Sequence, residues 1–232
     1  MKFLGVLDKV LDRVVLIFLL VLGLYVGYSI YDIWLLNHEA SISAGLVEYK
    51  PVKEDDTISF EELLKINSDV VGWVTIEGTN IDYPIVQGID NLEYVNKNVY
   101  GEFSLPGSIF LDCRNSSDFK DFYSIVYGHN MYGDYMFGCL EKFLGKSYLD
   151  SHVFGELVTK ESRYGIEWLT CTRVSAYDEI VFSPLRDKSK DLLRVLGVED
   201  IPEEKLIALS TCSDNDLNGR VLLIGKILNS GG

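Results

Sequence analysis

One segment near the N-terminus limits what the chain can fold into. Residues 14–31 (VVLIFLLVLGLYVGYSIY) carry no charged side chain, and the apolar character continues past Asp32 as far as Leu36. A run of ~20 apolar residues is long enough for a helix to cross a lipid bilayer. The sequence therefore predicts a transmembrane helix over residues 14–36, preceded by a short N-terminal segment over residues 1–13.

The flanks of this run predict its orientation. Basic residues gather on the cytoplasmic side of a membrane helix, and Lys2, Lys9 and Arg13 all precede the run. We therefore expect a cytoplasmic N-terminus, a single-pass anchor in the cell membrane and an extracellular domain. A cleaved signal peptide is the alternative, because Ser41 and Ser43 have the spacing that a signal peptidase needs. The apolar part of a signal peptide spans only ~7–15 residues, which favours the anchor.

The rest of the chain has the size and composition of one acidic domain. The net charge is −14, and the charges within residues 1–36 sum to zero, so the whole excess lies beyond them. An acidic surface repels nucleic acid, so no nucleic-acid partner is expected. A hydrophobic content of 47% excludes a disordered chain. We expect an extracellular linker over residues 37–57 and a single domain over residues 58–232.

Short runs of β-branched and aromatic residues predict a strand-rich domain. Turn residues such as Gly78 and Gly219 separate the runs. Many short strands with few long helices favour a closed or nearly closed β-barrel. The predicted strands cover residues 72–76, 81–86, 108–111, 123–127, 166–174, 206–211 and 221–227.

Three short helices are expected beside these strands. Ser59 and Glu62 form a capping box that predicts a helix at the start of the domain. Asp134 can cap a second helix that runs to Leu144, with Cys139 on its inner face as a small core residue. The segment 188–196 has the apolar spacing of a third helix.

The four cysteines, at positions 113, 139, 171 and 212, include no CxxC pair and no Cys/His spacing typical of zinc. We therefore expect no metal site and no cofactor. Cys212 is distinctive because it ends the apolar run 206–211 and precedes a polar loop. A strand end of this kind can hold a nucleophile rigidly and still admit a substrate. Position alone leaves an inert strand-end thiol open as the alternative, and disulfide pairing also stays open.

His129 and Arg220 occupy similar transitions between strand and loop. His129 follows the predicted strand 123–127, and Arg220 begins the predicted strand 221–227, eight positions after Cys212. Antiparallel pairing across the loop would bring Cys212 and Arg220 together. A cation there lowers the pKa of a thiol and stabilises an oxyanion. A structural histidine and a surface ion pair are the alternatives for these two residues.

Three segments in this order resemble the signature segments of the sortase family. They are YGHNM at 127–131, LSTC at 209–212, and GR followed by VLLIGK at 219–226. Upstream, GWVTIEGTNIDYPIVQG at 72–88, LEYVNKN at 92–98 and SIFLD at 108–112 are similar to class B sortases. The chain departs from the usual TLxTC pattern at Ala208, which weakens the assignment to a subfamily more than the assignment of the catalytic residues.

The resemblance implies a mainly β fold: a closed sortase-type β-barrel of about eight strands with short helical insertions, preceded by the N-terminal transmembrane helix. It implies a cysteine transpeptidase in which Cys212, His129 and Arg220 are catalytic. It also implies substrate contacts from four further residues, which are Thr211, Ser210, Asn130 and Asp214.

By this resemblance, the enzyme cleaves a C-terminal sorting motif of secreted proteins after Thr, through a cysteine thioester. It then transfers the acyl group to an amine of the peptidoglycan precursor or of a pilin subunit. Two alternatives remain open at this stage. One is a cysteine peptidase that uses the same site with water as acceptor, and the other is a membrane-tethered binding barrel without turnover.

Overall fold

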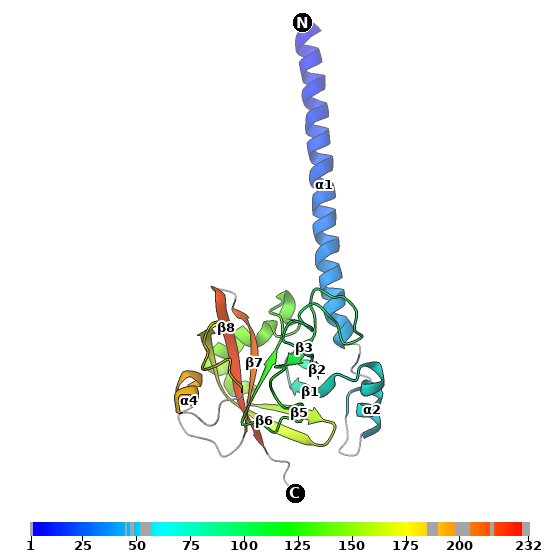
Figure 1. Cartoon of the computed structure of the whole chain (residues 1–232). Coiled ribbons are helices and arrows are strands. Elements are labelled where there is room, and N and C mark those ends of the chain that lie inside the picture. The colour runs from blue at the N-terminus through cyan, green and yellow to red at the C-terminus, as the bar shows by residue number, and fades with distance from the viewer. Residues whose placement is uncertain are drawn as a thin grey trace. The chain divides into compact units, whose positions relative to one another are not determined.

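The structure is a computed structural model that describes residues 2–44, 46, 49–51, 57–184, 190–197, 205–213 and 216–228. The chain divides into two compact units, Met1–His38 and Glu39–Gly232. The first unit consists of most of one long helix, and the second contains all of the strands (Figure 1).

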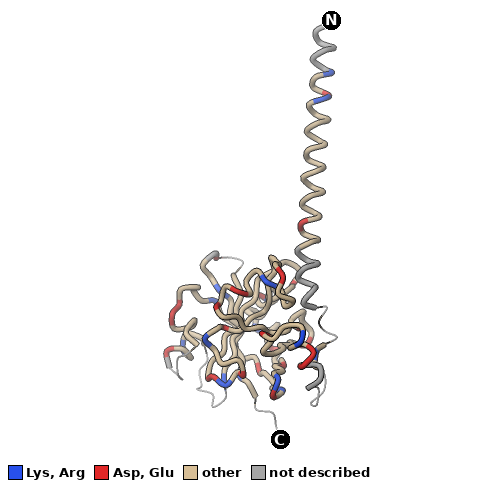
Figure 2. Tube along the Cα trace, turned by 45° about the vertical axis from the view of Figure 1, so that its right-hand side comes forward, with Lys and Arg blue, Asp and Glu red and all other residues tan. Residues whose placement is uncertain are grey.

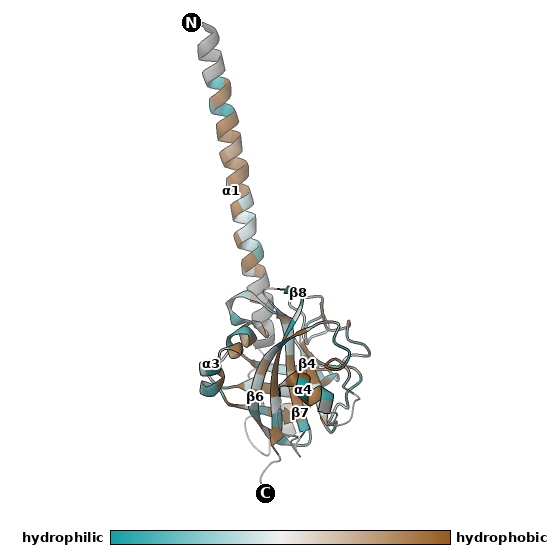
Figure 3. Cartoon of the chain, turned by 90° about the vertical axis from the view of Figure 1, so that its left-hand side faces the viewer, coloured by the Kyte–Doolittle hydropathy of each residue, from teal (hydrophilic) through white to brown (hydrophobic). Residues whose placement is uncertain are grey.

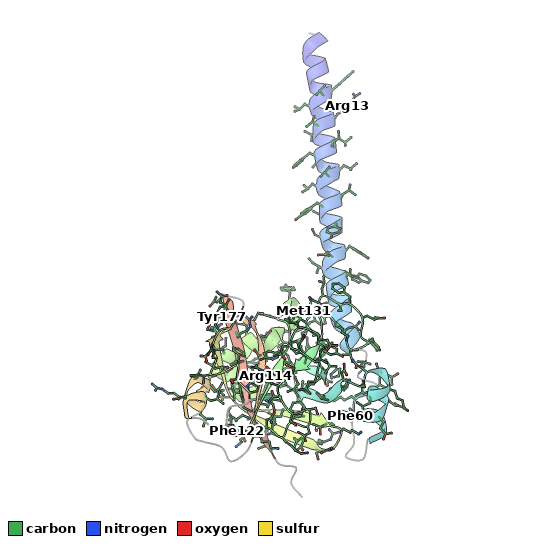
Figure 4. The ribbon with its side chains drawn as sticks, viewed as in Figure 1. Arg13, Phe60, Arg114, Phe122, Met131 and Tyr177 are labelled. Atoms are coloured by element: carbon green, nitrogen blue, oxygen red, sulfur yellow. The ribbon has the colours of Figure 1, made fainter. Side chains whose placement is uncertain are left out.

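The N-terminal helix is apolar, as predicted. Helix α1 spans Lys2–Ala44. Its part Lys9–Leu35 has a mean hydropathy of 2.3, and no residue of its most apolar stretch is buried. The stretch between Arg13 and Asp32 carries no charge (Figure 2), and its side chains project outward on all sides (Figure 4). By length and composition, this helix is able to cross a membrane.

Eight strands close into a barrel in the order β1-β2-β3-β4-β7-β8-β6-β5, which confirms the predicted fold. β2 pairs with β3 and β4 pairs with β7 in parallel, and the other neighbours are antiparallel. The strands are β1 (Val70–Ile76), β2 (Asp82–Val86), β3 (Ile109–Leu111), β4 (Tyr123–Tyr127), β5 (Phe154–Thr159), β6 (Arg163–Ser175), β7 (Lys205–Ser213) and β8 (Asp216–Leu228). Seven match predicted runs, whereas β5 was not predicted.

The predicted helix from Asp134 to Leu144 is wrong in form. The structure has two 3₁₀ helices there, η2 (Tyr132–Asp134) and η3 (Gly138–Leu144). Asp134 and Met136 have φ values of 63° and 52°, which lie in the left-handed region and interrupt an α-helix. Cys139 is 1% exposed, so its prediction as a small core residue is confirmed.

The other short helices are α2 (Thr57–Ile66), α3 (Lys146–Ser151) and α4 (Lys190–Leu196). α2 confirms a helix at the start of the domain and begins at Thr57, two residues before Ser59, whose side chain lies outside the described part of the chain. α4 confirms the helix predicted in segment 188–196, of which residues 188 and 189 lie outside the described residues.

Apolar side chains form three clusters that hold the barrel rigid. One draws on all eight strands and on η3 and forms the barrel interior. A second lies between α2, β1 and β2 and includes Phe60, labelled in Figure 4, and Leu46. The third covers the outer face of β4, β7 and β8 with α4, whose apolar residues are brown in Figure 3. β4 and β7 are therefore packed on both faces, which fixes the positions of their ends.

Candidate active site

Cys212 and Arg220 face each other across the β7–β8 ladder. The two residues are register partners in an antiparallel pair, and side chains directly opposite each other in such a pair lie on the same face. Cys212 is exposed, whereas the preceding strand residues 206–211 are buried. The predicted pairing of Cys212 with Arg220 across the loop is therefore present, and the guanidinium donates a hydrogen bond to Gly219 O at 2.9 Å.

His129 follows the end of β4, which is the parallel neighbour of β7. Two hydrogen bonds fasten the intervening Gly128 to β7. Gly128 N donates to Ser210 O at 3.1 Å, and Thr211 Oγ1 donates to Gly128 O at 2.9 Å. A Cβ at position 128 would lie 2.7 Å from Cδ2 and 2.9 Å from Cγ of the buried Phe137 ring, so glycine favours this close approach. The strand pairing thus brings His129 to the end of the barrel that carries Cys212.

A main-chain carbonyl orients the histidine ring. His129 Nε2 lies 2.9 Å from the carbonyl oxygen of Val95, in the connection between β2 and β3. A carbonyl oxygen only accepts hydrogen bonds, so Nε2 carries the hydrogen and donates it. In the neutral ring, Nδ1 is then the nitrogen that accepts a proton.

These residues line one pocket of about 190 Å³. Its lining combines the histidine, the cysteine, the arginine and three hydroxyl residues with Val95, Phe110 and Gly128. The lining residues are Val95, Phe110, Tyr127, Gly128, His129, Ser210, Thr211, Cys212 and Arg220. A thiol, an imidazole and a guanidinium on one small pocket can carry out nucleophilic attack, proton transfer and oxyanion stabilisation.

A buried carboxylate supports the aromatic wall of the pocket. Tyr127 packs against Phe110 at a ring distance of 5.3 Å and donates its hydroxyl to Asp112 Oδ2 at 2.9 Å. Asp112 is fully buried and also accepts a hydrogen bond from Asn91 and two from the Arg114 guanidinium. Burial raises the pKa of Asp112, but its hydrogen bonds outweigh burial and hold that pKa below the ordinary value.

The four predicted substrate contacts have different environments. Ser210 is 1% exposed and lines the pocket, and its hydroxyl has no hydrogen-bond partner. Thr211 lines the pocket as well, but its hydroxyl bonds to Gly128 O. Asn130 is not among the lining residues, and its Nδ2 donates to Cys212 O at 3.0 Å. Asp214 lies outside the described residues.

The other cysteines have no part in this pocket, and all four thiols are free. Burial raises the pKa of Cys139 to about 12, with a smaller contribution from Asp134. Burial likewise raises the pKa of Cys171 to about 12, helped by Glu141. Cys113 is half-buried. Cys212 is the exposed thiol.

Comparison with known proteins agrees with this geometry. No protein-family model matches the chain. Sortase B of Listeria monocytogenes is 32% identical, over 98% of this chain and 99% of its own length. A crystal structure of a Streptococcus pyogenes class B sortase involved in pilus biogenesis is 42% identical, covers 72% of this chain and 97% of its own, and has a TM-score of 0.66. A Staphylococcus aureus sortase B–substrate complex is 27% identical, covers 75% and 87% of the two chains, and has a TM-score of 0.68.

The closed barrel and the similarity to sortases over the whole chain identify the protein as a cysteine transpeptidase. The chain belongs to the sortase family and is most similar to its class B.

Sequence reasoning missed two sets of residues at this site. The carbonyl of Val95 orients the histidine, and Phe110 and Tyr127 form the aromatic wall. Val95 lies in the segment 92–98 that supported the resemblance. A sequence does not show which main-chain carbonyl accepts a hydrogen bond, because every residue has one. The strand residues Phe110 and Tyr127 had the pattern of core residues, and only the barrel register places them at the pocket.

Proposed function

We propose that this protein cleaves a C-terminal sorting motif of secreted proteins after a threonine and joins that threonine to an amine of the cell wall or of a pilin subunit. Cys212, His129 and Arg220 are the proposed catalytic residues. The observation that supports the proposal most is that all three line one pocket at the end of a closed barrel.

In the first half of the reaction, the Cys212 thiolate attacks the threonyl carbonyl carbon. The carbonyl oxygen becomes an oxyanion, and Arg220 stabilises its charge. His129 gives its proton to the leaving amine as the peptide bond breaks, which leaves a thioester on Cys212. Because Nε2 of His129 is engaged with Val95 O, Nδ1 is the nitrogen that we assign to this proton transfer.

In the second half, an incoming amine attacks the thioester carbonyl. His129 removes a proton from that amine, the new amide bond forms and the Cys212 thiolate leaves. Water in place of the amine would give a free acid, as in a cysteine peptidase.

Substrate binding is assigned to the rim and floor of the pocket. The unpartnered, buried hydroxyl of Ser210 is the strongest candidate, since a buried polar atom without a partner favours a ligand that supplies one. Thr211, Asn130 and Asp214 are retained as proposed contacts. The contact of Asn130 with Cys212 O gives it a second use, which is to hold the nucleophile strand.

The apolar helix supports a membrane location for the site. We propose that residues 14–36 cross the cell membrane with the N-terminus in the cytoplasm, and that residues 58–232 form the catalytic domain outside, joined by the linker 37–57. Secreted proteins that carry a sorting signal and the amines of the envelope meet at this surface. One similar class B sortase is involved in pilus biogenesis, which favours a pilin amine as an acceptor here.

Product analysis tests this function. The full chain in detergent micelles is incubated with a library of peptides that fixes Thr before the scissile bond, with and without an added primary amine. The proposal predicts an amide of the amine at the new C-terminus. A free acid at every amine concentration would identify a peptidase, and intact peptides throughout would identify a binding barrel.

A further inference from the structure

Side-chain hydrogen bonds hold the end of β7 at the two residues on either side of Cys212, which are Thr211 and Ser213. Thr211 bonds to Gly128 O, and the Ser213 hydroxyl donates to Glu141 Oε1 at 3.1 Å. Cys212 is therefore flanked by two residues whose side chains are anchored elsewhere.

The ladder itself supports this strand end weakly. The register between β7 and β8 shifts after Cys212, so that Cys212 faces Arg220 whereas Ser213 faces Asp216. A bulge of this kind interrupts the ladder locally and bends the strand. The side-chain anchor at Ser213 therefore acts where the main chain is least constrained.

Glu141 belongs to a rigid element. It lies in η3, whose Leu140 and Phe143 are buried in the barrel interior. The Glu141 side chain is 15% exposed, and its second oxygen accepts a hydrogen bond from Arg173 of β6. Arg173 compensates the charge of Glu141, so the carboxylate can accept from Ser213 without adding an uncompensated negative charge beside the thiol.

We infer that Glu141 is a positioning residue for the acyl transfer. It fixes Ser213, and through the peptide bond it fixes Cys212, at the place from which the thiol attacks. The inference rests on the proposed function of Cys212 as nucleophile. Displacing a reacting atom by about 1 Å can lower a rate by ~10²-fold, so a loosened strand end has a measurable effect on the chemical step.

The test uses the full chain in detergent with a cleaved peptide from the library. Ser213→Ala and Glu141→Ala each remove the contact. Glu141→Gln keeps an acceptor oxygen for Ser213. Glu161→Ala is the matched control, because Glu161 lies in the turn between β5 and β6, and its side chain is 68% exposed.

Ser213→Ala and Glu141→Ala should each lower kcat about 10-fold with little change in KM, because substrate binding is not altered. The double variant should be no worse than Glu141→Ala alone, because Glu141→Ala already removes the contact with Ser213. Glu141→Gln should retain kcat within about 3-fold of the unmodified chain, and Glu161→Ala should be unchanged.

Two further readouts separate positioning from loss of folding. The thermal midpoint gives the folded fraction, and the rate of alkylation of Cys212 by iodoacetamide, followed by peptide mass spectrometry, reports an intact thiol. A loss of kcat in folded protein with a normal alkylation rate supports positioning. Normal kcat in folded Ser213→Ala and Glu141→Ala, or equal losses in Glu141→Gln and Glu141→Ala, would overturn it. Turnover by Cys212→Ala, run in parallel, would instead defeat the proposed nucleophile.

Discussion

His129 Nε2 donates to the main-chain carbonyl of Val95 at a distance of 2.9 Å. The orientation of the proposed acid/base is thus set by the backbone of the β2–β3 connection and needs no carboxylate side chain.

Replacing Arg220 by Lys should lower kcat by ~10² or more, with a smaller change in KM. Lysine keeps the charge, but it is a point donor on a flexible stem and cannot hold an oxyanion in the fixed geometry of a guanidinium. Steady-state kinetics with a cleaved peptide provide the measurement. Arg163→Lys, a change in an ion pair with Glu156 away from the pocket, is the matched control. Near-normal kcat in both Arg220→Lys and Arg220→Ala would reduce Arg220 to a surface ion-pair partner.

Thiol labelling should distinguish the cysteines. The raised pKa values of Cys139 and Cys171, both about 12, keep these thiols protonated at pH 8, and the thiolate is the reactive form. Iodoacetamide on the folded chain at pH 8 should therefore modify Cys212 and leave Cys139 and Cys171 unmodified. Peptide mapping measures the modified fraction of each residue, and all should react once the chain is unfolded in urea. Fast labelling of Cys139 in the folded chain would contradict the packing of the barrel interior.

A chain that begins at Ser41 should be soluble, folded and active, whereas one that begins at Thr57 should be less stable. The longer form keeps Leu46, which is fully buried, and the contacts of Lys50 with Asp82 and of Pro51 O with Arg163. Loss of a buried leucine costs about 2 kcal/mol, which corresponds to a drop in Tm of ~5 °C for a domain of this size. Thermal unfolding of both forms checks this expectation, and equal midpoints would show that residues 41–56 add no stability.

Asp112→Asn should destabilise the domain most at neutral pH. Because the pKa of Asp112 in the fold is below its ordinary value, its ionised form stabilises the fold above pH ~4, and this contribution is lost as the pH falls below ~4. Removing one partner of a fully buried ion pair lowers the free energy of unfolding by ~3–5 kcal/mol. Because Arg114 is 42% exposed, solvent screens this pair, and we expect the free energy of unfolding to fall by about 2 kcal/mol.

Urea midpoints at pH 7, 5 and 3 measure that effect. The difference between the unmodified chain and Asp112→Asn should shrink at pH 3. Asp150→Asn, which removes an exposed i,i+4 pair with Lys146, is the control and should have little effect at any pH. A difference that grows toward acid pH would contradict the assigned direction of the pKa shift.

Most of the barrel could be predicted from the sequence because seven strands have an apolar or alternating pattern bounded by turn residues. β5 was not predicted because its first residue, Phe154, is exposed and because Gly155 and Glu156 interrupt the apolar pattern of a strand. Only its pairing with β1 and β6 identifies it as a strand. The helix at Asp134 was wrong because its residues favour an α-helix, and the left-handed backbone at Asp134 and Met136 is fixed by tertiary contacts.

The candidate site, like the barrel, could be predicted only in part from the sequence. Cys212, His129 and Arg220 stand at transitions between strand and loop within recognisable segments, so their side chains could be identified. The carbonyl of Val95 and the contact of Glu141 with Ser213 could not, because both depend on how distant segments meet in space.

The most direct test of the account is the mass of the enzyme during turnover. The full chain is mixed with a cleaved peptide and quenched with acid at short times, and peptide mapping locates any adduct. An acyl group should form on Cys212 and disappear when a primary amine is added, with an equal amount of amide product. His129→Ala should not form the adduct at a comparable rate, and Cys212→Ala should not form it at all. Turnover by Cys212→Ala, or product formation from the unmodified chain without an adduct on Cys212 at any time, would contradict the account.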